Sequence, residues 1–162
     1  MEKDSPEYAS VESQIDAIFE ELKLFEKRDL SEFVLREIGR YFAGTDNPFR
    51  AVPYFEELLA RTNPEAEEFK LLAEMELGII EMRAADPGKL QSARERFRRI
   101  IGSGKDKALI PQAWLNLSTL HIKNKEWSDA REALDTINKE KKWFQDEKEK
   151  RAEAGFLLGT VY

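Results

Sequence analysis

The sequence contains no cysteine and only one histidine, His121, among its 162 residues. A chain without cysteine forms no disulfide, no thiolate metal site and no cysteine nucleophile. One histidine alone also argues against a metal centre or an acid–base pair built on histidines. We therefore expect no catalytic residue, no bound metal and no cofactor, and a protein that is not an enzyme.

Long apolar runs and an excess of basic charge are absent as well. No stretch approaches the roughly 18 apolar residues that span a bilayer, and Met1-Glu2-Lys3-Asp4 lacks the basic and apolar regions of a signal peptide. Lys and Arg number 26 against 32 Asp and Glu, a net charge of −6, which disfavours binding to nucleic-acid phosphates. We expect a soluble chain without membrane insertion, located in the cytoplasm or, if it is a fragment, in the periplasm.

Small residues recur with a period near 40, at Gly39, Gly78, Ser118 and Gly159. The first three are each followed by a second pattern, in which an alanine precedes two large apolar residues at spacings of about one and two helical turns. The three copies are Ala51/Phe55/Leu58, Ala93/Phe97/Ile100 and Ala130/Leu134/Ile137. Pairs of antiparallel helices that cross closely need small residues at the crossing and large ones beside it. We expect each glycine or serine to face the alanine of the second helix.

Prolines and glycines predict where these helices begin and end. Asn47-Pro48, Asn63-Pro64 and Asp86-Pro87 each place a capping side chain before a proline, which is typical of a helix start. Gly102 follows an apolar run and predicts a helix end. Pro53 falls one turn inside the second helix of the first pair, where a proline causes a late start or a kink.

Several conspicuous side chains have a structural interpretation and a functional alternative. The arginines of segment 94–99 are predicted to form a solvated helix face, with an acidic partner as the alternative. Trp114 and Trp127 fall at core positions. His121 is predicted to be packed and partly buried, with ligand binding or proton transfer as the alternative. Trp143-Phe144 is predicted to cover a gap between repeats, or else to anchor a partner.

Two of the copies carry a fuller signature: Leu35-x2-Ile38-Gly39-x2-Phe42 and Trp114-x2-Leu117-Ser118-x2-His121. Together with the alanine pattern they resemble the tetratricopeptide repeat, whose consensus is Trp-x2-Leu-Gly-x2-Tyr, then Ala-x3-Phe, then Pro. The second copy departs from it, since Glu74 and Glu81 stand where large apolar residues are expected. The resemblance covers residues 31–162 and implies an all-α fold, a right-handed α-solenoid of antiparallel helix pairs.

The resemblance also divides the chain. The expected units are an N-terminal amphipathic helix packing on the array (1–30), a first repeat (31–64), a divergent second repeat with a long turn (65–104), a third repeat (108–142) and the first helix of a fourth (145–162), which is either truncated or a cap. Because the last helix has no second helix to cover it, self-association through this open C-terminal end is one expected contact.

A concave surface lined by the first helix of each pair is the site that the resemblance implies. Projected onto this sequence, the surface comprises Phe33, Arg36, Glu37, Arg40, Leu72, Met75, Glu76, Ile79, Gln112, Leu115, Asn116 and Thr119. Mixed apolar, amide and arginine character suits a peptide or a helix of a protein partner. Glu76 and Gln112 depart from the carboxylate-clamp subclass of the family.

The resemblance therefore implies a non-catalytic protein–protein interaction module. The alternative is a structural spacer, part of a larger multi-repeat bacterial scaffold or envelope-complex protein, without a ligand of its own. The two differ in one respect, because a spacer would tolerate charge reversal at Arg36 and Arg40.

Overall fold

The computed structural model describes residues 13, 14, 17, 18, 21, 26–84, 86–140, 142–145 and 147–162. In these ranges every regular element is a helix and there is no strand. Most of the predicted N-terminal helix, residues 1–30, lies outside the described residues. No helix in the described part of the chain is both long enough and apolar enough to cross a membrane.

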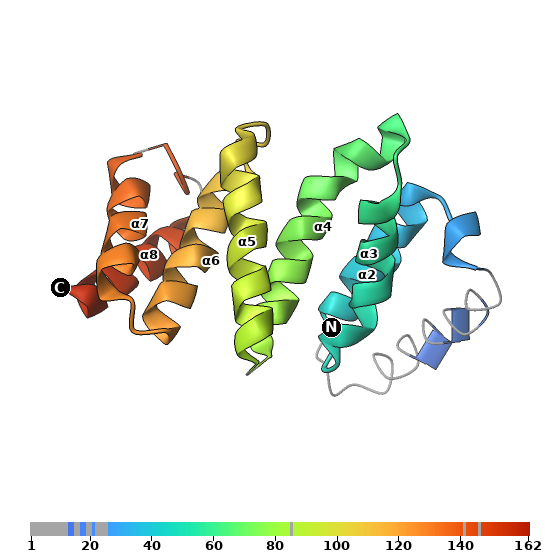
Figure 1. Cartoon of the computed structure of the whole chain (residues 1–162), viewed down its shortest axis with the longest axis horizontal. Helices are drawn as coiled ribbons and strands as arrows, with labels where there is room; N and C mark the ends of the chain where they lie inside the picture. The colour runs from blue at the N-terminus through green and yellow to red at the C-terminus, as the bar shows by residue number, and fades with distance from the viewer. Residues whose placement is uncertain are drawn as a thin grey trace.

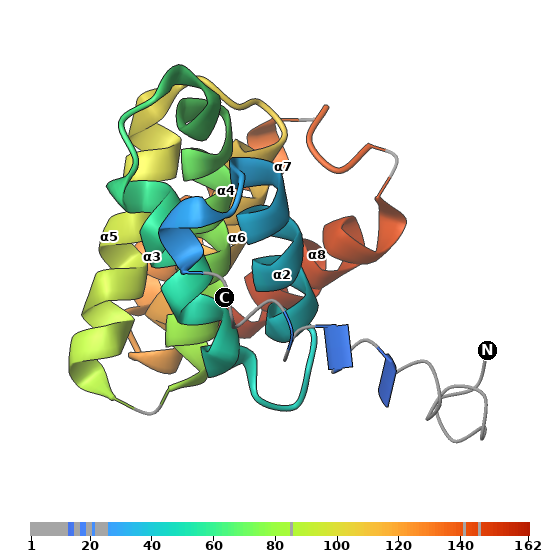
Figure 2. The ribbon, with the colours of Figure 1, turned by 90° about the vertical axis from the view of Figure 1, so that its right-hand side faces the viewer.

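The helices stand side by side along the long axis of the molecule (Figure 1). In chain order they are η1 (Lys27–Asp29), α2 (Glu32–Ala43), η2 (Pro48–Ala51), α3 (Val52–Ala60), α4 (Pro64–Arg83), α5 (Pro87–Ser103), α6 (Leu109–Lys123), α7 (Trp127–Lys139) and α8 (Lys148–Val161). Each α-helix packs on the next, and α2, α4, α6 and α8 also contact one another in that order. Helices α3 and α5 lie in a different layer from α2, α4 and α6 (Figure 2).

Three helix pairs result, and we refer to them as the first (α2 with α3), second (α4 with α5) and third (α6 with α7) hairpin. Helices α2 and α3 lie within residues 31–64, α4 and α5 within residues 64–104, and α6 and α7 within residues 108–142. Helix α8 follows the third hairpin and packs on α7 and α6.

The proline signals locate the helix starts. The predicted starts at Asn63-Pro64 and Asp86-Pro87 are confirmed, since α4 begins at Pro64 and α5 at Pro87. The Asp86 carboxylate caps α5 by accepting a hydrogen bond from the backbone N–H of Lys89 at 3.0 Å. The Asn63 side chain does not cap its own helix and donates instead to the Glu32 carboxylate at 2.9 Å.

The late start at Pro53 is confirmed and the helix end at Gly102 is wrong. A 3-10 helix, η2, precedes α3, so Pro53 falls in the first turn of α3, where its missing N–H leaves no helical bond unmade. Helix α5 continues through Gly102 and ends at Ser103, and the next residue, Gly104, has a φ of +62°, the left-handed conformation that favours glycine.

The first two hairpins each close on a glycine that lies against a phenylalanine ring. A Cβ atom built on Gly39 would lie 2.7 Å from the Phe55 ring, and one on Gly78 would lie 2.7 Å from the Phe97 ring. Both rings are fully buried. The expectation that the glycine faces the alanine of the second helix is therefore corrected, because the nearest side chain is the phenylalanine one turn further along.

This contact brings a second pair of positions together, three residues after the glycine and one residue before the phenylalanine. In the first hairpin they hold Phe42 and Tyr54, whose rings stack with centroids 5.8 Å apart. In the second they hold Glu81 and Arg96, and Arg96 Nε donates to Glu81 Oε2 at 3.0 Å. An ion pair thus takes the place of an aromatic pair, which accounts for the charged residue at an apolar position of the pattern.

The arginines of α5 are structural rather than simply solvated. Arg96 Nη1 also lies 2.6 Å from Glu74, which accepts a further hydrogen bond from Arg99 Nε at 2.9 Å. Arg94 Nη2 lies 2.7 Å from both carboxylate oxygens of Glu126. The predicted solvated face is therefore wrong for Arg94 and Arg96, whose side chains are mostly buried between helices.

A polar clamp fixes the start of α2. The Glu32 carboxylate accepts hydrogen bonds from Arg61 Nη1 at 2.7 Å and Asn63 Nδ2 at 2.9 Å, and Arg61 Nη2 reaches the carbonyls of Lys27 and Arg28. The hydrogen bonds from Asn63 and Arg61 lower the pKa of Glu32 from 4.5 to about 2.

The glycine–phenylalanine contacts predict opposite effects for two chemically identical substitutions. Gly78→Ala should destabilise the protein by about 1–3 kcal/mol, because its methyl group overlaps the buried Phe97 ring. Gly155→Ala in α8, where a Cβ meets nothing within 4 Å, should stabilise it by about 0.5–1 kcal/mol. Urea unfolding of both variants measures the difference. Equal effects would contradict the close approach.

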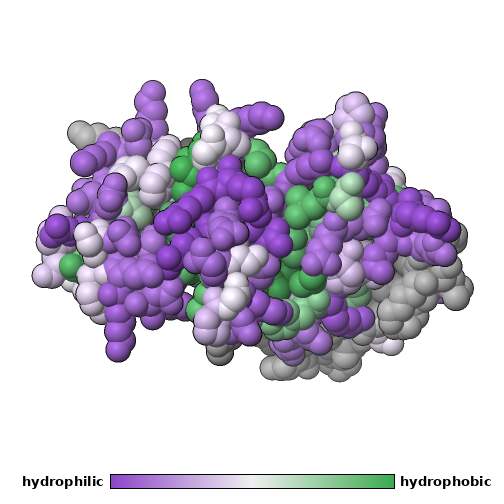
Figure 3. Space-filling view, in the orientation of Figure 1, coloured by the Kyte–Doolittle hydropathy of each residue, from purple (hydrophilic) through white to green (hydrophobic). Residues whose placement is uncertain are grey.

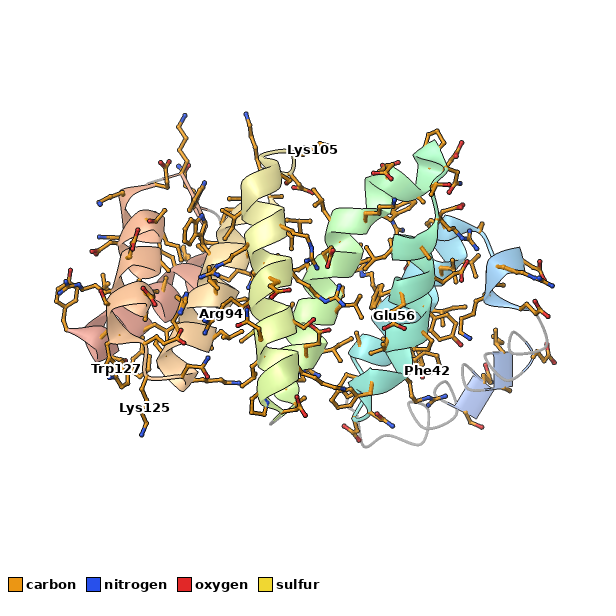
Figure 4. All side chains as sticks on the ribbon, in the orientation of Figure 1. Phe42, Glu56, Arg94, Lys105, Lys125 and Trp127 are labelled. Atoms are coloured by element: carbon orange, nitrogen blue, oxygen red, sulfur yellow. The ribbon has the colours of Figure 1, made fainter. Side chains whose placement is uncertain are left out.

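The clamp predicts how stability responds to acid. Because the folded pKa of Glu32 lies below its unfolded value of 4.5, its contribution is complete above pH 4.5 and is lost as the pH falls toward 2. The free energy of unfolding, measured with urea at a series of pH values, should therefore fall less between pH 4.5 and pH 2 for Glu32→Gln than for the wild type. Glu56→Gln, at an exposed carboxylate on α3 (Figure 4), is the control and should follow the wild-type curve. Parallel curves for all three proteins would contradict the clamp.

Candidate functional site

Helices α2, α4 and α6 supply the predicted surface residues, and these helices contact one another in succession. On α2, Phe33 is 57% exposed and the Arg40 side chain is also 57% exposed. On α6, Gln112, Asn116 and Thr119 are half-buried. We call this the A surface; its members are Phe33, Arg36, Glu37, Arg40, Leu72, Glu76, Ile79, Gln112, Asn116 and Thr119.

Two predicted members do not belong to it. Met75 is 3% exposed and Leu115 is 1% exposed. Met75 packs with Phe97 in the cluster of the second hairpin, and Leu115 packs with Leu134 in that of the third. The prediction that they contact a partner is therefore corrected, because their position on the helix turns them into the core.

Arg36 is held in place by its neighbours. Its guanidinium lies 4.7 Å from the centroid of Phe33 and 5.0 Å from that of Phe69, and Nη2 lies 2.7 Å from Glu37 Oε1. These contacts join α2 to α4 through cation–π and ionic interactions. Arg40 reaches Glu37 only at 3.9 Å, so Arg40 is the more available cation of the pair.

Glu76 is a half-buried carboxyl between two cations. Burial raises the pKa of Glu76, while Arg40 on α2 and Arg83 at the end of α4 act in the opposite direction. Among the described residues Glu76 makes no hydrogen bond and no ion pair within 4.0 Å. Arg40 and Arg83 therefore act on the Glu76 carboxyl through their charge, without a direct hydrogen bond to it.

Two side-chain amides on α6 bond to each other, and one of them contacts α4. Gln112 Nε2 donates to Asn116 Oδ1 at 3.4 Å, and Asn116 Nδ2 lies 3.4 Å from the sulfur of Met75. Gln112 Oε1 is buried and has no hydrogen-bond partner among the described residues. An unpaired buried acceptor costs about 1–3 kcal/mol.

At the C-terminal ends of the helices, polar groups are already engaged. Lys123 Nζ donates to the Met82 carbonyl at 3.2 Å, which ties the end of α6 to the end of α4. The Thr119 hydroxyl donates to the Leu115 carbonyl at 3.0 Å within its own helix. Gln112 and Asn116 therefore carry most of the free hydrogen-bonding capacity of α6 on the A surface.

The structure also reveals a polar group that the sequence analysis missed. Helix α6 ends in a Schellman motif, in which Lys125 has φ +59° and the Glu126 N–H donates to the His121 carbonyl at 2.9 Å. This turn brings Glu126 Oε2 to 2.5 Å from His121 Nδ1. Arg94 reaches the same carboxylate from α5 (Figure 4). The burial predicted for His121 is confirmed, at 3% exposed.

A metal-ligating arrangement exists at this turn in principle. His121, Glu126 and Asp129 offer one nitrogen and two oxygens within 4.8 Å of one another, a donor set that suits zinc or another transition metal. Arg94, however, occupies both oxygens of Glu126 and holds the pKa of that carboxyl below its usual range. The arrangement therefore functions as a hydrogen-bonded link among α5, α6 and α7.

The predictions for the aromatic residues near the C-terminal end are confirmed for two residues and wrong for a third. Phe144 is buried against the third hairpin and Trp143 packs partly buried against the same cluster, as expected of residues that cover a gap. Trp127, predicted to lie in the core, is 48% exposed, so that prediction is wrong. As the first residue of α7, it stands at the outer end of the third hairpin, beyond the packed interface (Figure 4).

No protein-family model, no curated protein and no solved structure matches this chain.

Proposed function

We propose that this chain is a non-catalytic protein-interaction module, a tetratricopeptide-like helical array whose A surface binds an extended peptide segment of a protein partner. The exposed side chains of Phe33 and Arg40 carry this proposal, because they lie on a surface that also holds the half-buried amides of Gln112 and Asn116. The proposal requires no cofactor, nucleic acid or membrane.

An extended peptide fits these groups better than a small molecule does. Its backbone N–H and carbonyl groups would pair with the half-buried side-chain amides of Gln112 and Asn116. Arg40 and Arg83, which lie near the half-buried Glu76, are positioned to bind an acidic side chain of the same peptide. Phe33, largely exposed at the beginning of α2, offers an apolar contact.

A structural spacer is the second candidate, and the surface of α8 favours it. Phe156 and Tyr162 are each 77% exposed on this helix. Large exposed aromatic side chains are typical of surfaces that bind another protein. A following repeat or a second copy of the chain, associating through the C-terminal end, would cover them.

Peptide selection against a random display library tests the proposed function. Arg40→Glu should weaken selected peptides about 10- to 100-fold, as expected for removing a charge-assisted hydrogen bond and adding repulsion. Lys107→Glu is the matched control, since it makes the same charge change at an exposed residue of the α5–α6 connection. Gln112→Ala should also weaken binding, and Lys107→Glu should leave it unchanged.

Two results would contradict the A surface as the binding site. Peptides that bind Arg40→Glu and Gln112→Ala as tightly as the wild type would place the site elsewhere. Failure to select any peptide would favour the spacer, provided that the variants retain wild-type helicity by circular dichroism.

A further inference from the structure

The third hairpin differs from the other two at the helix–helix contact that lies three residues after the small residue, which is Ser118 in this hairpin. The position of Phe42 and Glu81, three residues after the small residue, holds His121. The facing position, Tyr54 in the first hairpin, holds Ala133 in the third. Because alanine is much smaller than either tyrosine or the arginine of the second hairpin, the facing side chain does not reach across the interface.

A pocket lies at this place. It has a volume of about 300 Å³ and is lined by residues of α5, α6 and α7, including His121 and Ala133. This value is at the lower end of the range for ligand pockets. Apolar surface is visible on the α7 side of α5 (Figure 3).

In the second hairpin the corresponding space is filled by a guanidinium group from the chain itself. Arg96 extends between Glu81 and Glu74 and binds both, at 3.0 and 2.6 Å. The first hairpin also places a cation at this contact, since the Arg50 guanidinium lies 4.1 Å from the centroid of the Phe42 ring. A positive group at the helix–helix contact is therefore shared by both of the filled hairpins.

The third hairpin holds no cation at the positions equivalent to Arg50 and Arg96, but it keeps groups that would bind one. Asp129 stands at the position of Arg50, and Trp114 stands at the position of Glu74. Both line the pocket, together with Glu132. An indole face and two carboxylates are the groups that bind a guanidinium, through stacking and paired hydrogen bonds. Arg98 is the one arginine or lysine of the lining, beside the two carboxylates of Asp129 and Glu132.

We propose that this pocket binds an arginine side chain of a partner protein, which completes the third hairpin as Arg96 completes the second. The guanidinium stacks on Trp114 and pairs with Asp129 and Glu132 at the rim, while Leu117 contacts its aliphatic stem. Arginine is favoured over lysine because its planar group stacks on the indole and binds carboxylates in pairs. The site lies between α5 and α7 and is independent of the A surface.

The single histidine of the chain makes the test specific. Titration of the whole chain with N-acetyl-arginine methylamide, followed by the imidazole signals of His121 and the indole N–H signal of Trp114 in nitrogen-15 NMR, should give saturable shifts at both residues. The norleucine analogue, which has a similar stem without charge, should bind about tenfold more weakly.

Variants locate the binding. The double variant Asp129→Asn and Glu132→Gln should weaken binding of the arginine probe about tenfold. Glu68→Gln with Glu149→Gln, which removes the same charge at exposed positions of α4 and α8, should leave binding unchanged. Ala133→Arg supplies the missing side chain from within the chain and should abolish binding with unchanged helicity. If that variant does not fold, the rim variant still decides.

The proposal is overturned if the arginine probe gives no saturable shift, or if the norleucine analogue binds equally well. It is also overturned if zinc chloride shifts the His121 signals and the arginine probe does not. That outcome would assign His121, Glu126 and Asp129 as a metal site instead.

Discussion

In the first two hairpins the helices approach each other at a glycine set against a buried phenylalanine ring, and this is the constraint on which the rest of the packing depends. With no Cβ at Gly39 or Gly78, the rings of Phe55 and Phe97 lie directly on the neighbouring backbone. That contact fixes how far one helix slides along its partner, and it therefore decides which side chains face each other one turn away. Side-chain chemistry can then vary while the backbone arrangement is retained.

The variation at that next contact connects packing with function. An aromatic pair joins Phe42 to Tyr54 and an ion pair joins Glu81 to Arg96, whereas Ala133 leaves room beside His121. A closed hairpin offers another molecule only its outward-facing side chains. An open hairpin offers an interior contact to another molecule. The two proposed sites thus arise from one repeated geometry, on different faces of the array.

Sequence alone predicts the periodic features well and the side-chain contacts poorly. Helix starts at Pro64 and Pro87 depend on local chemistry, which the sequence contains in full. The burial of Met75 and Leu115 depends on how far α4 and α6 rotate about their axes, which a pattern of spacings determines only to within about one residue. The link between His121 and Glu126 requires a left-handed conformation at Lys125, for which the sequence has no glycine signal.

The equivalence of the hairpins is the central claim, and exchanging one contact for another tests it directly. Glu81→Phe with Arg96→Tyr transfers the aromatic pair of the first hairpin into the second. Glu81→Phe removes one of the two carboxylates that bind Arg96, and Arg96→Tyr leaves Glu81 without its guanidinium partner, so each single substitution should destabilise the protein. The double variant should have an unfolding free energy within about 1 kcal/mol of the wild type, because Glu74 keeps its ion pair with Arg99. A double variant destabilised by the sum of the two single effects would contradict the claim that these positions are equivalent.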